Sequence, residues 1–254
     1  MATMTFSKND FCKLVGREFS TEELAEKLPM LGLSWERTEG DEIEVEIFPN
    51  RPDMLSVEGL ARAFGAFVGI DIGLVDYSVA EPDYSVAVDA STTEVRPYMA
   101  CAVIKNIVLD DETIRSILQL QEKLHATHCR RRAKASIGVY DLDKIKFPLK
   151  YTTVDKDFKF TPLDWKTPHT ISAILEKHPR GVEYGWILKS DRYPILMDSK
   201  DSVLSMPPII NSHETAITQK TKNLFIDVTG TDHKTIKEVL NIVVTALADR
   251  GGEI

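Results

Sequence analysis

VLSMPPIINS, residues 203–212, is an apolar run that is interrupted by two adjacent prolines and followed by an asparagine and a serine. Pro207 and Pro208 donate no backbone hydrogen bond and have a fixed φ, so the run is neither a helix nor an ordinary central strand. The prolines predict a stiff apolar corner, with Ser205 just before it and Asn211 just after it. Because rigid corners often hold functional loops in place, we expect this corner to border a recognition pocket.

The segments around the corner predict strands and helices of a mixed fold. YPILMD (193–198) and SVLSM (202–206) read as a hairpin with a turn at Ser199 and Lys200, and KNLFIDVTG (222–230) reads as a strand that ends at Gly230. Residues 110–128 have the apolar spacing of a helix with Gln121 on the buried stripe, where a polar group needs partners. Residues 233–249 form the clearest amphipathic helix, ended by Gly251.

The first 80 residues read as a separate small unit. They contain a capping box at Ser20 and Glu23, an alternating strand at 41–47, and a helix at 55–70 with Leu60, Phe64 and Phe67 on one face. They hold seven Lys and Arg against fifteen Asp and Glu, while residues 81–254 hold 24 of each. We therefore predict an α+β protein: a small mixed N-terminal domain (1–80) and a larger α+β domain (81–254) with a β-sheet core flanked by helices.

Composition restricts the function classes. The chain is 43% hydrophobic and 28% charged, with a net charge of −8, which is typical of a globular protein and argues against a general nucleic-acid coat protein. It contains no apolar run of about 18 residues and no signal-peptide pattern, so we expect a soluble cytoplasmic protein with no membrane contact. The three scattered cysteines argue against a disulfide framework.

The common catalytic motifs are missing: no GxSxG, HExxH, P-loop or GxGxxG occurs. His125, His128 and Cys129 have helical spacing and could bind a metal, but without an evident fourth ligand we interpret them as surface residues at a helix end. Arg130, Arg131 and Arg132 form a basic cluster that could contact phosphate or could simply be a solvated helix end. Asp227, an acid inside an apolar strand, is either paired structurally or placed for binding.

Several long stretches resemble one protein family. FPNRPDMLSVEGLAR (48–62) resembles the N-terminal signature of the phenylalanyl-tRNA synthetase beta subunit, and LQLQEKLH (118–125), CRRRAKASIGVYDLDKIK (129–146), VLSMPPIINS and KNLFIDVTGTD (222–232) look like its archaeal and eukaryotic branch. They occur in the family's order over nearly the whole chain. The resemblance implies an N-terminal fragment of the beta subunit that contains the editing domain.

The resemblance also implies a function. In this family the beta subunit pairs with an alpha subunit that makes the aminoacyl bond, as an (αβ)2 heterotetramer, and its editing domain hydrolyses tRNA(Phe) mischarged with tyrosine. We therefore expect an aminoacyl-tRNA ester hydrolase that belongs to phenylalanine-tRNA ligase, with tRNA(Phe) and tyrosine as partners. No cofactor is expected in this fragment, because ATP and magnesium belong to the synthetic site of the full synthetase.

By this resemblance, Ser205 and Asp227 are the best candidates for binding the amino acid, and Leu196, Met206, Asn211 and Gln121 are further candidates. Arg130, Arg131 and Arg132 are the candidates for tRNA contact. We expect a bound water, rather than a covalent nucleophile, to attack the ester. The residue that activates this water is unknown, and no metal is expected.

One position departs from the family pattern: Ala216 stands where a basic residue is expected. Either the role moved to Lys220 or Lys222, or editing is weakened, or the residue was changed deliberately. A noncatalytic module for tRNA docking or subunit assembly is therefore the alternative function. A free-standing editing factor is a third reading.

Overall fold

The computed structural model describes residues 2–254 and confirms the α+β class. The first part of the chain forms a three-stranded antiparallel sheet, in the order β1-β3-β2, with helices packed against it. Its elements are β1 (Ala2–Ser7), α1 (Lys8–Val15), α2 (Thr21–Lys27), η1 (Leu28–Leu31), β2 (Ser34–Glu39), β3 (Glu42–Ile47), η2 (Pro52–Met54) and α3 (Val57–Phe67).

Local sequence signals account for these elements. The capping box of α2 is present, since Ser20 accepts from the Glu23 N–H and the Glu23 side chain accepts from the Ser20 N–H. In β3 the alternation places Ile43, Val45 and Ile47 in the core. The prediction was wrong for Phe67, which is 46% exposed because it is the last residue of α3 and projects past the edge of the core.

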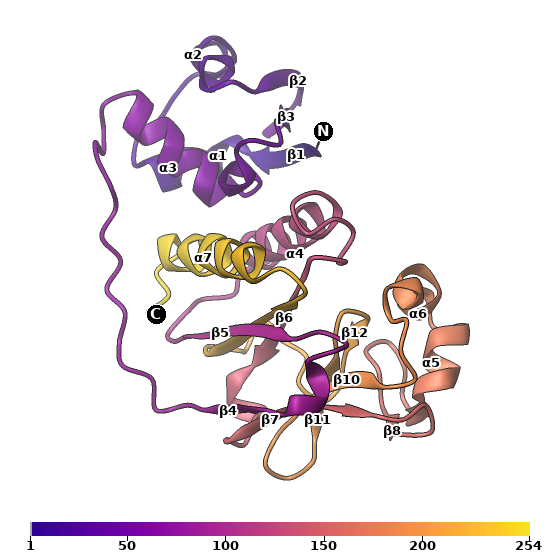
Figure 1. The fold of residues 1–254 in the computed structure, drawn as a ribbon. Helices are drawn as coiled ribbons and strands as arrows, with labels where there is room; N and C mark the ends of the chain where they lie inside the picture. Colours follow the sequence, from indigo (N-terminus) through magenta and orange to yellow (C-terminus); the bar gives the residue numbers. More distant parts are fainter. Residues whose placement is uncertain (1) are drawn as a thin grey trace.

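A second three-stranded antiparallel sheet, in the order β5-β13-β6, forms the centre of the larger part. Its strands are β5 (Tyr98–Ile104), β6 (Ala135–Asp141) and β13 (Leu224–Gly230). Two helices, α4 (Asp111–Ala126) and α7 (His233–Asp249), cover the face of this sheet that points toward the first unit (Figure 1). Asp110 caps α4, and Gly251, with φ of 87°, ends α7.

A five-stranded sheet, in the order β12-β11-β10-β7-β4, packs on the opposite face (Figure 1). Its strands are β4 (Val86–Val88), β7 (Leu149–Val154), β10 (Tyr193–Met197), β11 (Val203–Met206) and β12 (Ile210–Asn211). The predicted hairpin is β10–β11, with Leu196 paired to Ser205. The prolines stand in the turn between β11 and β12, where no ladder hydrogen bond is required of them.

The remaining elements extend to one side of this sheet (Figure 1). They include a two-stranded ribbon and two short helices, α5 and α6, that bring chain segments close to the proline corner. The bounds are β8 (Lys159–Phe160), β9 (His169–Thr170), α5 (Ile171–Lys177), α6 (Pro179–Tyr184) and, as single turns, η3 (Ala90–Thr92), η4 (Leu142–Lys144) and η5 (Gly185–Ile187).

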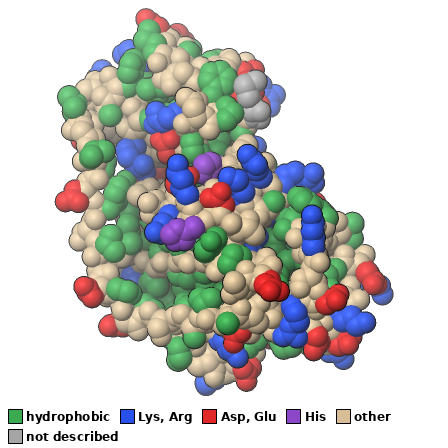
Figure 2. Space-filling view, viewed as in Figure 1, with side chains coloured by type: hydrophobic (Ala, Val, Ile, Leu, Met, Phe, Trp, Pro, Cys, Tyr) green, Lys and Arg blue, Asp and Glu red, His purple; other side chains and the backbone are tan. Residues whose placement is uncertain are grey.

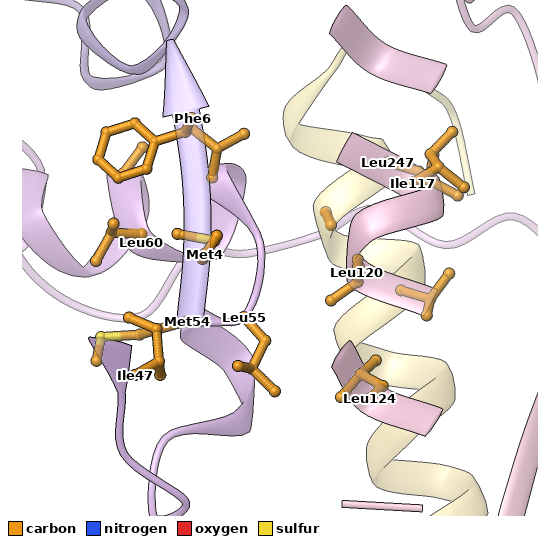
Figure 3. Close-up of a cluster of buried hydrophobic side chains, with 14 of the residues drawn as sticks. Met4, Phe6, Ile47, Met54, Leu55, Leu60, Ile117, Leu120, Leu124 and Leu247 are labelled. Atoms are coloured by element: carbon orange, nitrogen blue, oxygen red, sulfur yellow. The ribbon is translucent and has the colours of Figure 1, made fainter. Parts of the chain in front are cut away.

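The hydrophobic core continues from the first unit into the larger part. Met4 and Leu55 lie opposite Ile117 and Leu120 of α4 in one cluster of buried side chains, and Leu247 of α7 belongs to it as well (Figure 3). Residues 68–85 form no helix or strand and run along the outside of the molecule to β4 (Figure 1). The domain boundary at residue 80 stays a prediction. None of the described helices combines the length and apolar character needed to cross a bilayer.

Candidate active site

A cavity of about 440 Å³ opens beside the proline corner. Ligand pockets have volumes of roughly 300–1,000 Å³, so the space suits a small organic group. Three segments supply most of its wall: α4 (Leu118, Gln121, Glu122, His125), β6 (Ser136, Ile137, Gly138, Tyr140) and the corner with β12 (Pro207, Pro208, Ile209, Ile210, Asn211). The wall therefore combines apolar and polar side chains.

Three hydroxyl and carboxyl groups meet in the wall of the cavity. The Tyr140 hydroxyl lies 2.8 Å from Ser205 Oγ and donates a hydrogen bond to Asp227 Oδ1. The three residues come from β6, β11 and β13, so the contact between the two sheets brings them together. Gly138 makes room for this group, because a Cβ at this position would stand 2.1 Å from Tyr140 Oη and 2.3 Å from Asp227 Oδ1.

Asp227 is an unusual carboxylate because it is only 1% exposed. Burial raises its pKa from 3.8 to about 6, and the hydrogen bond from Tyr140 and the charge of Arg96 oppose this rise. Above about pH 6 the group is therefore ionised. Its Oδ2 atom accepts no hydrogen bond from the side chains and backbone of residues 2–254, so this oxygen is left as an acceptor for a ligand.

Gln121 and Asn211 add two side-chain amides to the wall. Gln121 Nε2 donates to the backbone oxygen of Ile137 at 3.0 Å. This hydrogen bond supplies one of the partners that the sequence predicted a polar side chain on the buried face of the helix would need. Asn211 Nδ2 lies 3.4 Å from the backbone oxygen of Val139. Both residues line the cavity, so the structure brings four of the six predicted amino-acid-binding residues to it.

Leu196 and Met206 do not line the cavity. Leu196 is fully buried on β10, one strand further from the cavity than Ser205, and packs in the cluster that contains Tyr140 and Phe225. Met206 directly follows Ser205 on β11, and successive side chains of a strand point to opposite faces, so it packs in a different cluster.

The three arginines of the basic cluster point to three different places. Residues 130–132 have φ values of 49°, 52° and 66°, which form a left-handed turn that separates their side chains. Arg132 turns to the cavity, and its Nη1 donates to the backbone oxygens of Pro208 (3.0 Å) and Ile209 (2.9 Å). Its Nε is buried and has no partner among the described residues.

The other two arginines lie outside the cavity. Arg131 is exposed, with its guanidinium carbon 6.0 Å from the centre of the Trp186 ring. Arg130 lines a separate crevice of about 430 Å³ between the first unit and the end of α4. Lys and Arg side chains lie across the middle of the molecule in the view of Figure 2, with acidic side chains between them, and do not form one uniformly basic face.

His125 lies in the last turn of α4, and His128 and Cys129 follow the helix. Among residues 2–254 no group of three or more His, Cys, Asp and Glu side chains is placed to hold a metal ion. The interpretation as surface residues was wrong for two of them, since His125 and Cys129 are buried. The Ile137 N–H donates to His125 Nε2 at 2.8 Å, and burial lowers the pKa of this histidine well below its usual range. His128 instead pairs with Glu238 at 3.0 Å.

Ala216 lies in the loop after β12 and is not part of the cavity wall. The Lys144 amine donates to its backbone oxygen at 2.7 Å, so a cation is held next to this position. Sequence reasoning missed Tyr140, Gly138 and Arg180 as cavity residues. In the sequence Tyr140 and Gly138 read as ordinary members of a buried strand, and no local signal distinguished them.

Comparison with known proteins identifies relatives of this chain. The family model of the B3/4 domain matches residues 95–241. The chain is 46% identical to the phenylalanine–tRNA ligase beta subunit of Archaeoglobus fulgidus and 44% identical to that of Methanosarcina barkeri, over its whole length and 46% of each relative. It therefore spans about half the length of these curated relatives.

A solved structure shows the same fold. The crystal structure of an N-terminal fragment of the phenylalanyl-tRNA synthetase beta subunit from Pyrococcus horikoshii superposes with a TM-score of 0.96 at 40% sequence identity. The match covers 99% of the present chain and 75% of that one. Fold and sequence thus agree over both units of the molecule.

Proposed function

The chain belongs to the phenylalanine–tRNA ligase beta-subunit family and contains its B3/4 domain, and on this basis we propose that it hydrolyses the ester of tyrosine mischarged onto tRNA(Phe). One observation carries the proposal: a buried carboxylate with a free oxygen stands in the wall of a cavity that has both apolar and polar side chains. A phenol differs from a phenyl ring by one hydroxyl, which is the group such an oxygen recognises.

Discrimination follows from the energetics of buried polar groups. A tyrosine in the cavity would donate its phenolic hydrogen to Asp227 Oδ2, while a phenylalanine would leave that carboxylate oxygen without water and without a partner. A buried polar group without a partner costs about 1–3 kcal/mol, and sites built around a hydroxyl reject analogues that lack it. Tyr140, whose hydroxyl also lies 2.8 Å from Ser205 Oγ, donates to the other carboxylate oxygen and so orients the group.

Other polar groups in the cavity wall suit the ester and the terminal ribose. Gln121, Asn211 and the unpartnered Nε of Arg132 lie around the same cavity. We propose that these groups orient the ester and a water molecule, which attacks the carbonyl carbon and releases the amino acid. The free hydroxyl of the terminal ribose is the further group that would position this water.

Binding of free amino acids tests this recognition. We expect the chain to bind tyrosine at least ~10-fold more tightly than phenylalanine, as measured by calorimetry at pH 8, which corresponds to about 1.4 kcal/mol. Asp227→Ala should abolish the preference, and Asp201→Ala, an acid on an exposed turn, should preserve it. An unchanged preference in Asp227→Ala would remove this residue from the proposed site.

A second role, in subunit assembly, is favoured by the exposed apolar side chains of residues 68–85. Ile72 is 85% exposed, Leu74 is fully exposed, and both border a groove of about 560 Å³. We propose that this segment contacts the alpha subunit of an (αβ)2 synthetase, in which ATP and magnesium act at the synthetic site. The double variant Ile72→Ser, Leu74→Ser should then weaken co-purification with the alpha subunit and leave tyrosine binding unchanged.

A further inference from the structure

Two arginine–aromatic pairs lie beside the cavity, and Arg132 of one pair belongs to its wall. In the inner pair, the Arg132 guanidinium lies 4.2 Å from the centre of the Tyr184 ring. In the outer pair, the Arg131 guanidinium lies 6.0 Å from the centre of the Trp186 ring. The left-handed turn of residues 130–132 and the short segment α6–η5 each supply one member of both pairs.

The two pairs differ in how much of their surface is already covered. Tyr184 is only 9% exposed, and Arg132 is tied to the proline corner by two hydrogen bonds. Trp186 is 51% exposed, and its Nε1 donates to the backbone oxygen of Glu183 at 3.0 Å, which fixes the plane of the indole. The inner pair is therefore a packed contact with Arg132 in the cavity wall, and the outer pair is an open, rigid aromatic surface.

Arg131 brings a free positive charge to this surface. Its side chain forms no salt bridge or hydrogen bond with any described residue, whereas Arg180 is paired with Glu183 at 3.0 Å and lies 3.6 Å from Glu122. The guanidinium stands over the indole at 6.0 Å, the outer limit of a cation–π contact, and the ring is still 51% exposed. The surface thus combines an open aromatic ring with an unpaired cation.

We propose that Trp186 and Arg131 form a stacking platform for the last nucleobase of an RNA 3′ end, with Arg131 on the adjoining phosphate. The inference rests on the proposed function, because an amino acid ester in the cavity places the terminal ribose at its mouth. The attached base then lies outside the cavity, next to the outer pair. Stacking of a base on an aromatic side chain, flanked by a cation on the backbone, is a general mode of binding to single-stranded ends.

An uncharged RNA tests the platform without any hydrolysis. The probe is a stem–loop with a single-stranded 3′ tail that ends in adenosine, and its partner RNA has an abasic ribose in place of that last nucleotide. Tryptophan emission and the dissociation constant are measured for the wild-type chain, Trp186→Ala, Trp186→Phe and Arg131→Ala. Val182→Ala, at an exposed residue of the same segment, is the matched control.

For the wild type we expect quenched emission with adenosine-ended RNA and roughly 5- to 100-fold weaker binding of the abasic RNA, in line with stacking by one base. Trp186→Ala should lose the quenching and bind both RNAs equally, Trp186→Phe should keep most of the difference, and Arg131→Ala should weaken both. Val182→Ala should match the wild type.

The platform would be refuted if Trp186→Ala still distinguished the two RNAs as the wild type does, or if the wild type showed no RNA-dependent quenching. These outcomes are independent of the ester chemistry. A chain that hydrolyses the tyrosine ester but ignores the base would overturn the platform alone, and a chain that senses the base without hydrolysis would overturn the proposed function alone.

Discussion

Gly138 lies against Tyr140 Oη and Asp227 Oδ1, the hydrogen-bonded pair that holds the carboxylate of the proposed site. Because a Cβ would come within 2.3 Å of both Tyr140 Oη and Asp227 Oδ1, Gly138→Ala must displace the hydrogen-bonded pair. We expect a loss of the tyrosine preference and about 1–3 kcal/mol lower stability, as is usual for overpacking. Calorimetry and urea unfolding check the two effects. Gly65→Ala, where the nearest atom is 4.0 Å away, should change neither, and equal behaviour of the two variants would contradict the prediction.

Because the pKa of Asp227 is raised, the proposed recognition of tyrosine should depend on pH. An ionised carboxylate accepts a stronger hydrogen bond than a protonated one, so the tyrosine preference should fall as pH drops through about 6. The Tyr140 hydrogen bond lowers this pKa, so Tyr140→Phe should move the midpoint to higher pH. Amino acid binding between pH 5 and 8 measures both midpoints. A preference that stays constant over this range would contradict the assignment.

Stability should respond to the same group with the opposite sign. The pKa of Asp227 is raised on folding, so its contribution to stability is complete below about pH 4 and is lost as pH rises through about 6. The loss is about 3 kcal/mol for a shift of two units. Asp227→Asn removes this dependence. Urea unfolding measures the free energy of unfolding of both proteins. The difference, variant minus wild type, should be larger at pH 8 than at pH 4, and a difference that does not change with pH would disprove the prediction.

At the scale of elements, the left-handed turn after α4 is joined to the proline corner through one side chain. Arg132 donates to two successive carbonyl oxygens and covers the Tyr184 ring. Lysine lacks the planar fork, so Arg132→Lys should lower stability by about 1–3 kcal/mol and weaken tyrosine binding. Arg130→Lys, at an exposed residue of the same turn, is the matched control. Thermal unfolding measures the stability and calorimetry measures tyrosine binding. If Arg132→Lys changed neither, the proline corner would be rigid without the Arg132 guanidinium.

Most elements could be predicted because their signals are local. The capping box of α2, the hairpin β10–β11 and the long helix α7 each follow from residues within about twenty positions. The left-handed turn of residues 130–132 was not predictable, because arginine has no preference for positive φ. Tertiary contacts of Arg132 with the corner hold this conformation, and these contacts are far away in sequence.

The candidate site illustrates the same limit. Ser205 and Asp227 could be predicted as site residues from the sequence because each is a polar residue inside an apolar run. Tyr140 did not, since a tyrosine in a strand is ordinary, and only the contact between two sheets gives it its role. Leu196 was predicted because it pairs with Ser205 in the hairpin. The pairing does not show on which side of β11 the cavity lies, and the cavity is on the β12 side, away from Leu196 on β10.

At the scale of the whole molecule, Arg250 joins the first unit to the rest. It donates to Glu58 at 2.6 Å and to both carboxylate oxygens of Asp10, and all three side chains are at most 13% exposed. Arg250→Ala leaves two buried carboxylates unpaired, so we expect about 3–5 kcal/mol lower stability and faster proteolysis of residues 68–85. Urea unfolding and limited proteolysis measure this.

A second ion pair across the same interface is the control. Arg115 of α4 lies 3.4 Å from Glu42 of β3, but both side chains are more than half exposed. Exposed pairs contribute little, so Arg115→Ala should unfold close to the wild-type midpoint. If the two variants proved equally stable, the buried network would not be what holds the units together.

Release of the amino acid from charged tRNA is the most direct test. The 254-residue chain is mixed with tRNA(Phe) carrying labelled tyrosine and, separately, labelled phenylalanine, and free amino acid is followed over time. We predict rapid release of tyrosine alone, and its loss in Asp227→Ala. No release from either tRNA, also after Ala216→Arg, would contradict an editing site and leave docking or assembly as the function.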